Sequence, residues 1–313
     1  MGRWTKENQE GYDVWAGETD AVSIRVIPEL GSKVISLVNR RSNREWLWRS
    51  GKALGNQGFG SSFGASDESG WDEMFPSINE CLYPEAPWMG NKIPDHGEVW
   101  SSKWQASCTE GELHCRVEGV CLPYSLEKRY SFVSENILRM DYTLTNRSDS
   151  PFSFLWAAHP LFRIHEGMRL NVPGELSEIE TSYSQDQRLG VFQDKLAWPI
   201  IESEQGMLDL RLIESADSKS AEKYYFTGKL ELGMAQLSDP ATGEAVTLRF
   251  PAETVPYLAV WANYGGFGGH YHLAIEPATG RMDDLAHAVL HNEAAVIGAH
   301  GTYRWFLEME ITS

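Results

Sequence analysis

The chain has 313 residues, a hydrophobic content of 42% and a formal net charge of −17. This length fits either two average domains or one large all-β domain, and the apolar content is ample for a substantial core. An acidic surface repels phosphate backbones and anionic lipids, so neither nucleic acid nor a membrane is an expected partner.

The first 15 residues contain no apolar segment of the kind found in a secretory signal, and no apolar run in the sequence is long enough to span a bilayer. The cysteines show no CxxC spacing; they are Cys81, Cys108, Cys115 and Cys121. These features together predict a cytoplasmic protein with reduced cysteines.

Strand patterns begin near residue 21 and continue through the first half of the chain. Residues 21–48 read as a β meander, with an alternation at Val22, Ile24 and Val26 that resumes at 34–37 after turn residues. Residues 110–120 and 124–162 continue this pattern, and the second of them alternates most regularly over 138–144. The turn residues at 146–151 separate that run from the next apolar one.

Four later runs are also typical of strands: residues 245–250, 257–264, 271–276 and 301–311. Residues 281–292 are the best candidate for a helix, and this segment is short. Many short strands separated by turn residues predict an all-β protein, a large antiparallel β-sandwich with few short helices. No linker or repeat divides the chain, so we expect residues 1–313 to form a single domain.

Residues 55–100 differ from the rest because they are rich in Gly, Pro, Ser and Trp and have little periodicity. A loop of this length inside a compact domain is usually either functional or disordered. Its aromatic residues argue against disorder, so the segment is expected to contribute to function.

Three polar residues stand where apolar runs end beside Pro or Gly: His96 in "PDHGEVW", His159 in "WAAHPLF" and Glu276 in "AIEPATG". A histidine in such a place is often structural. Glu276 is less ordinary, because it ends an alternation whose other face is apolar, and a carboxylate there is costly unless it is paired or used. The apolar face comprises Tyr271, Leu273 and Ile275, and the other face comprises His270, His272, Ala274 and Glu276.

Five segments occur in a characteristic order: "MFPSINE", "DHGEVW", "LTNRSDSP", "AAHPLF" and "AIEPATG". In their residues and their order they resemble the motifs of the aldose 1-epimerase (galactose mutarotase) family. The resemblance covers most of the chain, from about residue 20 onwards. The resemblance implies a large antiparallel sandwich that binds a sugar in a cleft on one concave sheet. It also implies an isomerase that interconverts the α and β anomers of a small-molecule sugar without a metal or organic cofactor, as a monomer or homodimer.

By position in these motifs, Glu276 matches the family's general base and His159 its general acid. His96 and Asn79 match residues that bind the substrate. The chemistry requires a proton to leave the anomeric hydroxyl while another reaches the ring oxygen, so we expect the two catalytic groups on opposite sides of the C1–O5 bond. Shielding from water is expected to raise the pKa of Glu276 towards neutrality, with His159 limiting the rise.

The sequence departs from the family pattern at several substrate-binding positions. Glu80 replaces an arginine and Leu161 replaces a tyrosine. We therefore expect this protein either to bind a different sugar from the rest of the family or to bind its sugar with another cation. The family's mid-chain aspartate is missing, and Glu222 and Lys223 stand near its place, either in the site or as two solvated charges. We expect Lys223, Asp72 and the ring of Trp261 to complete the substrate-binding set, which is given in full as His96, Asn79, Asp72, Lys223 and Trp261.

Two alternatives remain open from the sequence. His270, His272 and Glu276 have the ligand spacing of a cupin metal site, which predicts a metal-dependent sugar isomerase. Against it, no P-x-G-x-x-H segment follows, and the motifs around His96 and His159 are left unexplained. The other alternative is a carbohydrate-binding protein without turnover, or another carbohydrate-active enzyme of the same fold, since fold alone does not give an activity.

Overall fold

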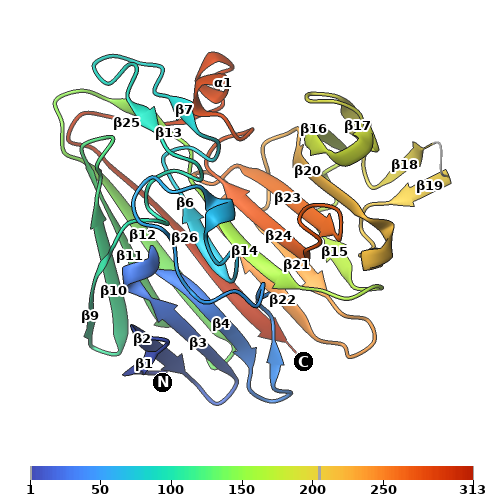
Figure 1. Ribbon diagram of the computed structural model, residues 1–313, viewed down its shortest axis with the longest axis horizontal. Coiled ribbons are helices and arrows are strands. Elements are labelled where there is room, and N and C mark those ends of the chain that lie inside the picture. Colours follow the sequence, from blue (N-terminus) through green and yellow to red (C-terminus); the bar gives the residue numbers. More distant parts are fainter. Residues whose placement is uncertain (1, 204–205, 313) are drawn as a thin grey trace.

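The computed structural model describes residues 2–203 and 206–312, which fold into two large antiparallel β-sheets (Figure 1). One extensive hydrophobic cluster contains buried side chains from both sheets, so the sheets pack face to face around a shared core. The predicted fold class, a large antiparallel β-sandwich with few short helices, is confirmed.

The first sheet has twelve strands in the described part of the chain. In spatial order they are β1 (Arg3–Gln9), β2 (Tyr12–Glu18), β3 (Val22–Ile27), β4 (Lys33–Asn39), β6 (Trp71–Met74), β14 (Ala157–Arg163), β24 (Tyr271–Ala278), β23 (Tyr257–Tyr264), β20 (Ser220–Phe226), β16 (Glu178–Ser184) and β17 (Lys195–Ala197), with β5 (Arg44–Glu45) paired to β4. Its central strands come from distant parts of the chain, which brings the predicted polar motifs onto neighbouring strands.

The second sheet has eight strands within the same described ranges. They are, in order, β15 (Arg169–Asn171), β21 (Met234–Ser238), β22 (Ala245–Arg249), β26 (Thr302–Thr312), β12 (Ile137–Asn146), β11 (Tyr124–Phe132), β10 (Glu112–Glu118) and β9 (Gln105–Thr109). In the described ranges, three two-stranded sheets complete the strands: β13 (Phe152–Phe154) with β25 (Ala295–Ile297), β18 (Ile200–Ser203) with β19 (Gly206–Asp209), and β7 (Cys81–Leu82) with β8 (Lys92–Ile93).

The alternation seen in the sequence corresponds to the two faces of the strands. Along β12 every second side chain is buried, as predicted for 138–144. On β24, Leu273 and Ile275 enter the core between the sheets, while His272 and Glu276 lie on the face turned away from the second sheet. That outer face of the first sheet is where the polar residues of interest gather.

Two segments cover this outer face and its edge. Residues 55–100 run across it mostly as loop, with the short turn Phe63–Ala65 and strand β6 inside the segment (Figure 1). The predicted helix 281–292 is shorter than expected: α1 spans Leu285–Leu290, and the side chain of Asp284 caps it by accepting from the backbone N–H of His287. Helix α1 packs near β7 and β13 at one end of the sheet.

Within the described residues, three further short helical turns have the 3₁₀ form, at Pro28–Leu30, Gln185–Gln187 and Ala216–Ser218. Across the residues that the structure describes, no helix has the length and apolar character needed to cross a membrane.

Candidate active site

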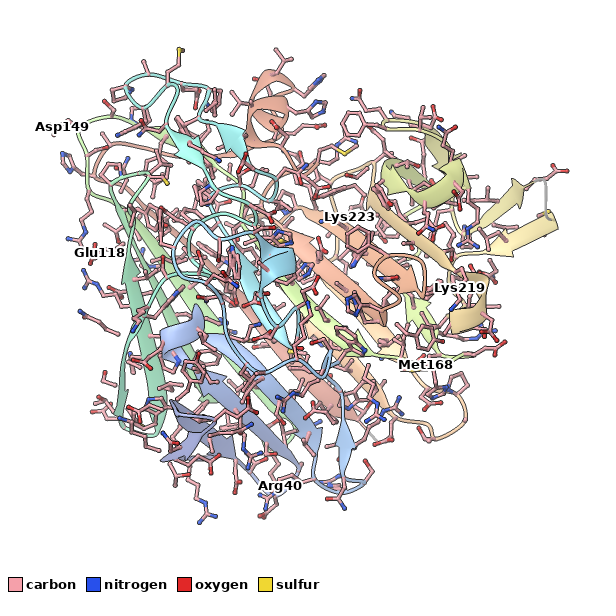
Figure 2. The ribbon with its side chains drawn as sticks, viewed as in Figure 1. Arg40, Glu118, Asp149, Met168, Lys219 and Lys223 are labelled. Atoms are coloured by element: carbon pink, nitrogen blue, oxygen red, sulfur yellow. The ribbon has the colours of Figure 1, made fainter. Side chains whose placement is uncertain are left out.

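A cavity of about 350 Å³ opens on the outer face of the first sheet. Strands β14, β24, β23, β20 and β16 supply its floor and one wall, and the 55–100 segment supplies the opposite wall. Figure 2 marks Lys223 in this part of the molecule. The lining residues are Phe63, Glu68, Ile78, Asn79, His96, His159, Leu161, Ser182, Tyr183, Lys223, Trp261, Asn263, Phe267, His270, His272 and Asp283.

His159 and Glu276 meet directly beneath the cavity. They stand on the adjacent strands β14 and β24, whose register pairs Leu161 with Ala274 and Ala157 with Ala278. His159 Nδ1 lies 3.1 Å from Glu276 Oε1, and the two side chains are buried, Glu276 completely. They therefore do not lie on opposite sides of a sugar-sized space, as the sequence led us to expect; only His159 of the two lines the cavity.

Lys223 joins Glu276 to a second carboxylate, that of Asp283. The Lys223 Nζ atom is 2.8 Å from Glu276 Oε2 and 2.8 Å from Asp283 Oδ1. Asp283 also accepts hydrogen bonds from the hydroxyl of Tyr225, at 2.8 Å, and from that of Ser182. Lys223 is therefore not a solvated charge, which was the alternative reading of this position, but a buried bridge between two carboxylates.

These contacts decide the charge of Glu276. Burial alone would raise the pKa of its carboxyl group, but the ammonium of Lys223 and the hydrogen bond with His159 outweigh burial and lower that pKa to about 2. The expected rise towards neutrality is wrong because the sequence did not reveal the Lys223 contact. Burial lowers the pKa of His159, although the bond to Glu276 opposes this. At neutral pH the pair is an ionised carboxylate that accepts from Nδ1–H of a neutral imidazole.

His96 forms a second pair of this kind on the other wall. Its Nδ1 atom lies 2.7 Å from Asp95 Oδ1, and its ring stacks on Phe63 with centroids 4.2 Å apart. Burial would raise the pKa of Asp95, but the hydrogen bond with His96 reverses this and lowers it to about 2. The rings of His96 and His159 are 5.4 Å apart and nearly perpendicular.

The backbone of His96 is held in a conformation uncommon for residues other than glycine, with φ of 58°. Its N–H donates to the carbonyl of Ile78 at 2.7 Å, which ties its loop to the irregular segment between β6 and β7 that carries Asn79. A strained backbone that fixes a cavity-lining imidazole is typical of functional sites.

The remaining end of the cavity carries His270 and His272. The ring of His272 packs on Trp48, and its buried Nδ1 atom has no hydrogen-bond partner among the described residues. His270 Nε2 lies 3.6 Å from Glu68 Oε2. These imidazoles do not converge with Glu276, and no group of three His, Cys, Asp or Glu in the described ranges is arranged to hold a metal ion. The cupin-like alternative has no support in this geometry.

Among the predicted substrate-binding residues, His96, Asn79, Lys223 and Trp261 line the cavity. Asp72 does not. It shares the outer face of the sheet, opposite His159 in the pairing of β6 with β14, but it is covered and lies 3.1 Å from Lys33 Nζ.

Two departures from the family pattern, Glu80 and Glu222, lie outside the cavity, whereas Leu161 lines it. Glu80 extends to solvent and pairs with Lys92 at 2.8 Å, so it does not occupy the place of an arginine in the site. Glu222 is buried against Arg188, at 2.8 Å, on the opposite face of β20 from Lys223.

Sequence analysis missed several lining residues. Asp283 lay within the predicted helix, where a carboxylate carries no special signal. Ser182, Asn263 and Phe267 stand in segments without a motif, and only the strand order of the sheet brings them to the cavity.

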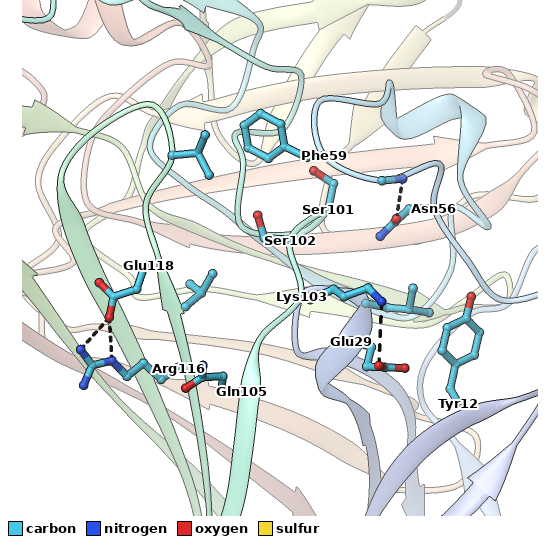
Figure 3. A pocket seen from close by; sticks show the side chains of 14 residues that line it. Tyr12, Glu29, Asn56, Phe59, Ser101, Ser102, Lys103, Gln105, Arg116 and Glu118 are labelled. Atoms are coloured by element: carbon cyan, nitrogen blue, oxygen red, sulfur yellow. Dashed lines mark hydrogen bonds and ion pairs between the residues drawn. The ribbon is translucent and has the colours of Figure 1, made fainter.

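A larger hollow, of about 870 Å³, lies near β2, β9 and β10 (Figure 3). Its charged side chains pair with one another: Lys103 with Glu29 at 4.0 Å, and Arg116 with Glu118 at 2.6 Å. The hollow therefore shows no arrangement of acid and base groups comparable to that around His159.

Comparison with known proteins supports the fold. No protein-family model matches the sequence, and no curated protein sequence matches it. Among solved structures, the chain is similar to a galactose mutarotase related enzyme from Lactobacillus acidophilus, with a TM-score of 0.69 and 14% identity over 96% of this chain and 97% of that one. It is also similar to a galactose mutarotase-like protein from Clostridium acetobutylicum, with a TM-score of 0.68 and 14% identity over 99% and 98% of the two chains.

A third solved structure, from Escherichia coli K12 and provisionally described as an aldose 1-epimerase, has a TM-score of 0.67 and 13% identity over 100% of this chain and 99% of that one. The chain therefore has the galactose mutarotase-like fold, and the resemblance inferred from the sequence motifs holds at the level of fold. Sequence identities this low do not establish that the proteins share an activity.

Proposed function

We propose that the protein is an aldose 1-epimerase, which interconverts the α and β anomers of an aldose by opening and closing its ring. The observation that supports this best is a pair of imidazoles in one cavity, each hydrogen-bonded to its own carboxylate. These are His159 with Glu276 and His96 with Asp95, and the two rings are 5.4 Å apart. A sugar-binding protein without turnover does not need two such pairs.

In the proposed reaction, neutral His159 accepts the proton of the anomeric hydroxyl. Glu276 accepts a hydrogen bond from the Nδ1–H of His159 and stabilises the imidazolium that forms. The other ring nitrogen, Nε2, is therefore the atom that accepts the proton from the sugar. His96, as an imidazolium paired with Asp95, donates a proton to the ring oxygen and becomes neutral, and the C1–O5 bond opens to the aldehyde. Rotation about C1–C2 and the same transfers in reverse close the other anomer.

This proposal gives Glu276 a positioning role, because His159 rather than Glu276 faces the cavity. The sequence motif led us to expect the carboxylate itself as the base. The carboxylate is still required, since without it the imidazolium of His159 would be buried and unpaired.

The rest of the cavity suits the hydroxyl groups of an uncharged sugar. Among the described lining residues, Lys223 is the one lysine or arginine, and two carboxylates already balance its charge. Asn79, Asp283 and the unpartnered Nδ1 of His272 offer further donors and acceptors. We therefore propose a neutral aldose rather than a sugar phosphate as substrate, with no metal or organic cofactor.

The proposal is tested by anomer exchange in a panel of aldoses, followed by saturation-transfer NMR or by optical rotation after dissolving a pure anomer. We expect the protein to accelerate mutarotation of at least one neutral aldose. Binding of a sugar with no acceleration for any member of the panel would instead identify a carbohydrate-binding protein.

A further inference from the structure

Three aromatic rings among the lining residues form a continuous group. They belong to Tyr183 on β16, Trp261 on β23 and Phe267 in the turn between β23 and β24. Ring centroids are 5.9 Å apart between Tyr183 and Trp261 and 5.8 Å apart between Trp261 and Phe267. The three rings therefore make a continuous surface, which we call the aromatic rim.

Two of the three rings in the aromatic rim are exposed, and Trp261 between them is half-buried. Tyr183 is 43% exposed and Phe267 is 52% exposed. Contiguous exposed apolar groups beside a cavity are typical of ligand contacts, whereas single exposed rings need no explanation.

Phe267 is held in place by a buried polar residue. The turn around it reads "GGFGG", and three of its glycines adopt positive φ, at 265, 268 and 269. Despite this flexible composition, the Asn263 side chain donates to the carbonyl of Phe267 at 2.9 Å and accepts from its N–H at 3.1 Å. Asn263 is fully buried, so these two bonds fix the exposed ring at the cavity mouth.

The position of the aromatic rim suits contact with the end of a sugar that lies away from its anomeric carbon. The catalytic imidazoles lie at one side of the cavity, on β14 and on the 55–100 segment, whereas the aromatic rim lies across the floor, on β23 and β16. A sugar with its anomeric carbon at His159 extends its other carbons over the sheet towards the rim. The cavity, at about 350 Å³, lies at the lower end of the range of roughly 300–1,000 Å³ that is typical of small-molecule sites.

We propose that the aromatic rim is a subsite for a second sugar ring, so that the preferred substrate is a reducing disaccharide rather than a free monosaccharide. This inference rests on the proposed function, because the reducing ring is placed by the epimerase chemistry. The C–H face of a pyranose packs on an aromatic ring and leaves its hydroxyls in water, which suits an exposed rim.

The test compares monosaccharides with disaccharides that share the same reducing ring: glucose against maltose, cellobiose, lactose and melibiose. Affinity is measured by calorimetry, and anomer exchange by NMR, for the unmodified protein and for Phe267→Ala. Phe267 is half exposed, so its truncation does not open the core. Phe59→Ala is the matched control, because Phe59 is 50% exposed and lines the other hollow (Figure 3).

We expect at least one disaccharide to bind more tightly than glucose, and Phe267→Ala to weaken that disaccharide about threefold to tenfold while leaving glucose unchanged. Phe59→Ala is expected to change neither, and Phe267→Tyr to retain the disaccharide affinity. Equal losses for glucose and disaccharides, or no disaccharide that binds better than glucose, would overturn the subsite. Aromatic-dependent disaccharide binding without any anomer exchange would overturn the proposed function and leave the subsite standing.

Discussion

His159 on β14 and Glu276 on β24 form a direct hydrogen bond, 3.1 Å long between Nδ1 and Oε1, beneath the floor of the cavity. Both residues come from motifs visible in the sequence, but their relationship is not the one that an acid–base pair on opposite sides of a sugar would require. The carboxylate accepts from the imidazole, and the imidazole lines the cavity. This arrangement determines the pH dependence and the mutational effects expected below.

The pH profile of anomer exchange follows from the neutral form of His159. Burial lowers the pKa of this imidazole below its ordinary value of about 6.5. A base must be deprotonated to act, so kcat/KM rises with pH on a limb centred below the ordinary histidine pKa of about 6.5. A rising limb centred above pH 7 would show that His159 is not the base.

Lys223 is expected to stabilise the fold by neutralising the carboxylates of Glu276 and Asp283. Lys223→Met leaves Glu276 and Asp283 buried without their shared cation, so the pKa of Glu276 rises and a stabilising ion pair is lost. Breaking such a pair typically costs about 3–5 kcal/mol of unfolding free energy. Chemical denaturation at pH 7 measures the loss.

The double variant Lys223→Met/Asp283→Asn is the control, because it removes one of the two unpaired carboxylates. We expect it to recover part of the lost stability. Equal stability of the single variant and the unmodified protein would show that Lys223 is not engaged as described.

Asp72 is expected to affect stability rather than substrate binding. Burial raises its pKa to about 6, although Lys33 opposes the rise. The folded state therefore holds a proton on Asp72 between about pH 4 and pH 6 that the unfolded chain has released, so the protein loses stability as pH rises through this window. Asp72→Asn lacks this dependence.

We therefore expect the stability of Asp72→Asn, relative to the unmodified protein, to improve from pH 4 to pH 7, as measured by urea denaturation at each pH. Its KM for the best sugar is expected to be unchanged, because the side chain does not line the cavity. A raised KM would restore Asp72 to the substrate-binding set.

We propose that residues 1–313 form one domain, as expected from the sequence. Strand β6 pairs with β14, and β26 lies between β22 and β12, so each sheet combines early and late parts of the chain. Limited proteolysis of the folded protein is expected to yield no fragment that refolds alone, and denaturation to give a single transition. Two separable compact fragments would contradict this.

The sequence was most informative where strand periodicity was strong. The run 257–264 is observed as β23, and the two faces of 271–276 are separated as predicted. Period-two alternation directly reports which side of a strand faces the core, which is why the fold class could be predicted.

The electrostatics of the site could not be predicted in the same way. The pKa of Glu276 depends on Lys223, two strands away on β20, and the charge of Lys223 depends on Asp283, which resembled an ordinary residue of a helix. Neither contact follows from periodicity, because both depend on the order of strands in the sheet. The pair of Asp95 and His96 was adjacent in the sequence, and a carboxylate beside a candidate catalytic histidine was the signal that could have revealed it.

The most direct test of the account is anomer exchange by Glu276→Gln on the best sugar, measured by saturation-transfer NMR together with the sugar affinity. Gln keeps the shape and a hydrogen-bonding oxygen but cannot stabilise an imidazolium at His159. We expect affinity close to that of the unmodified protein and exchange reduced by about 100-fold or more. The residual activity is expected to shift its rising limb to lower pH, because the bond to Glu276 no longer raises the pKa of His159. Exchange as fast as in the unmodified protein, with the same pH profile, would contradict the central claim that the Glu276–His159 pair drives anomer interconversion.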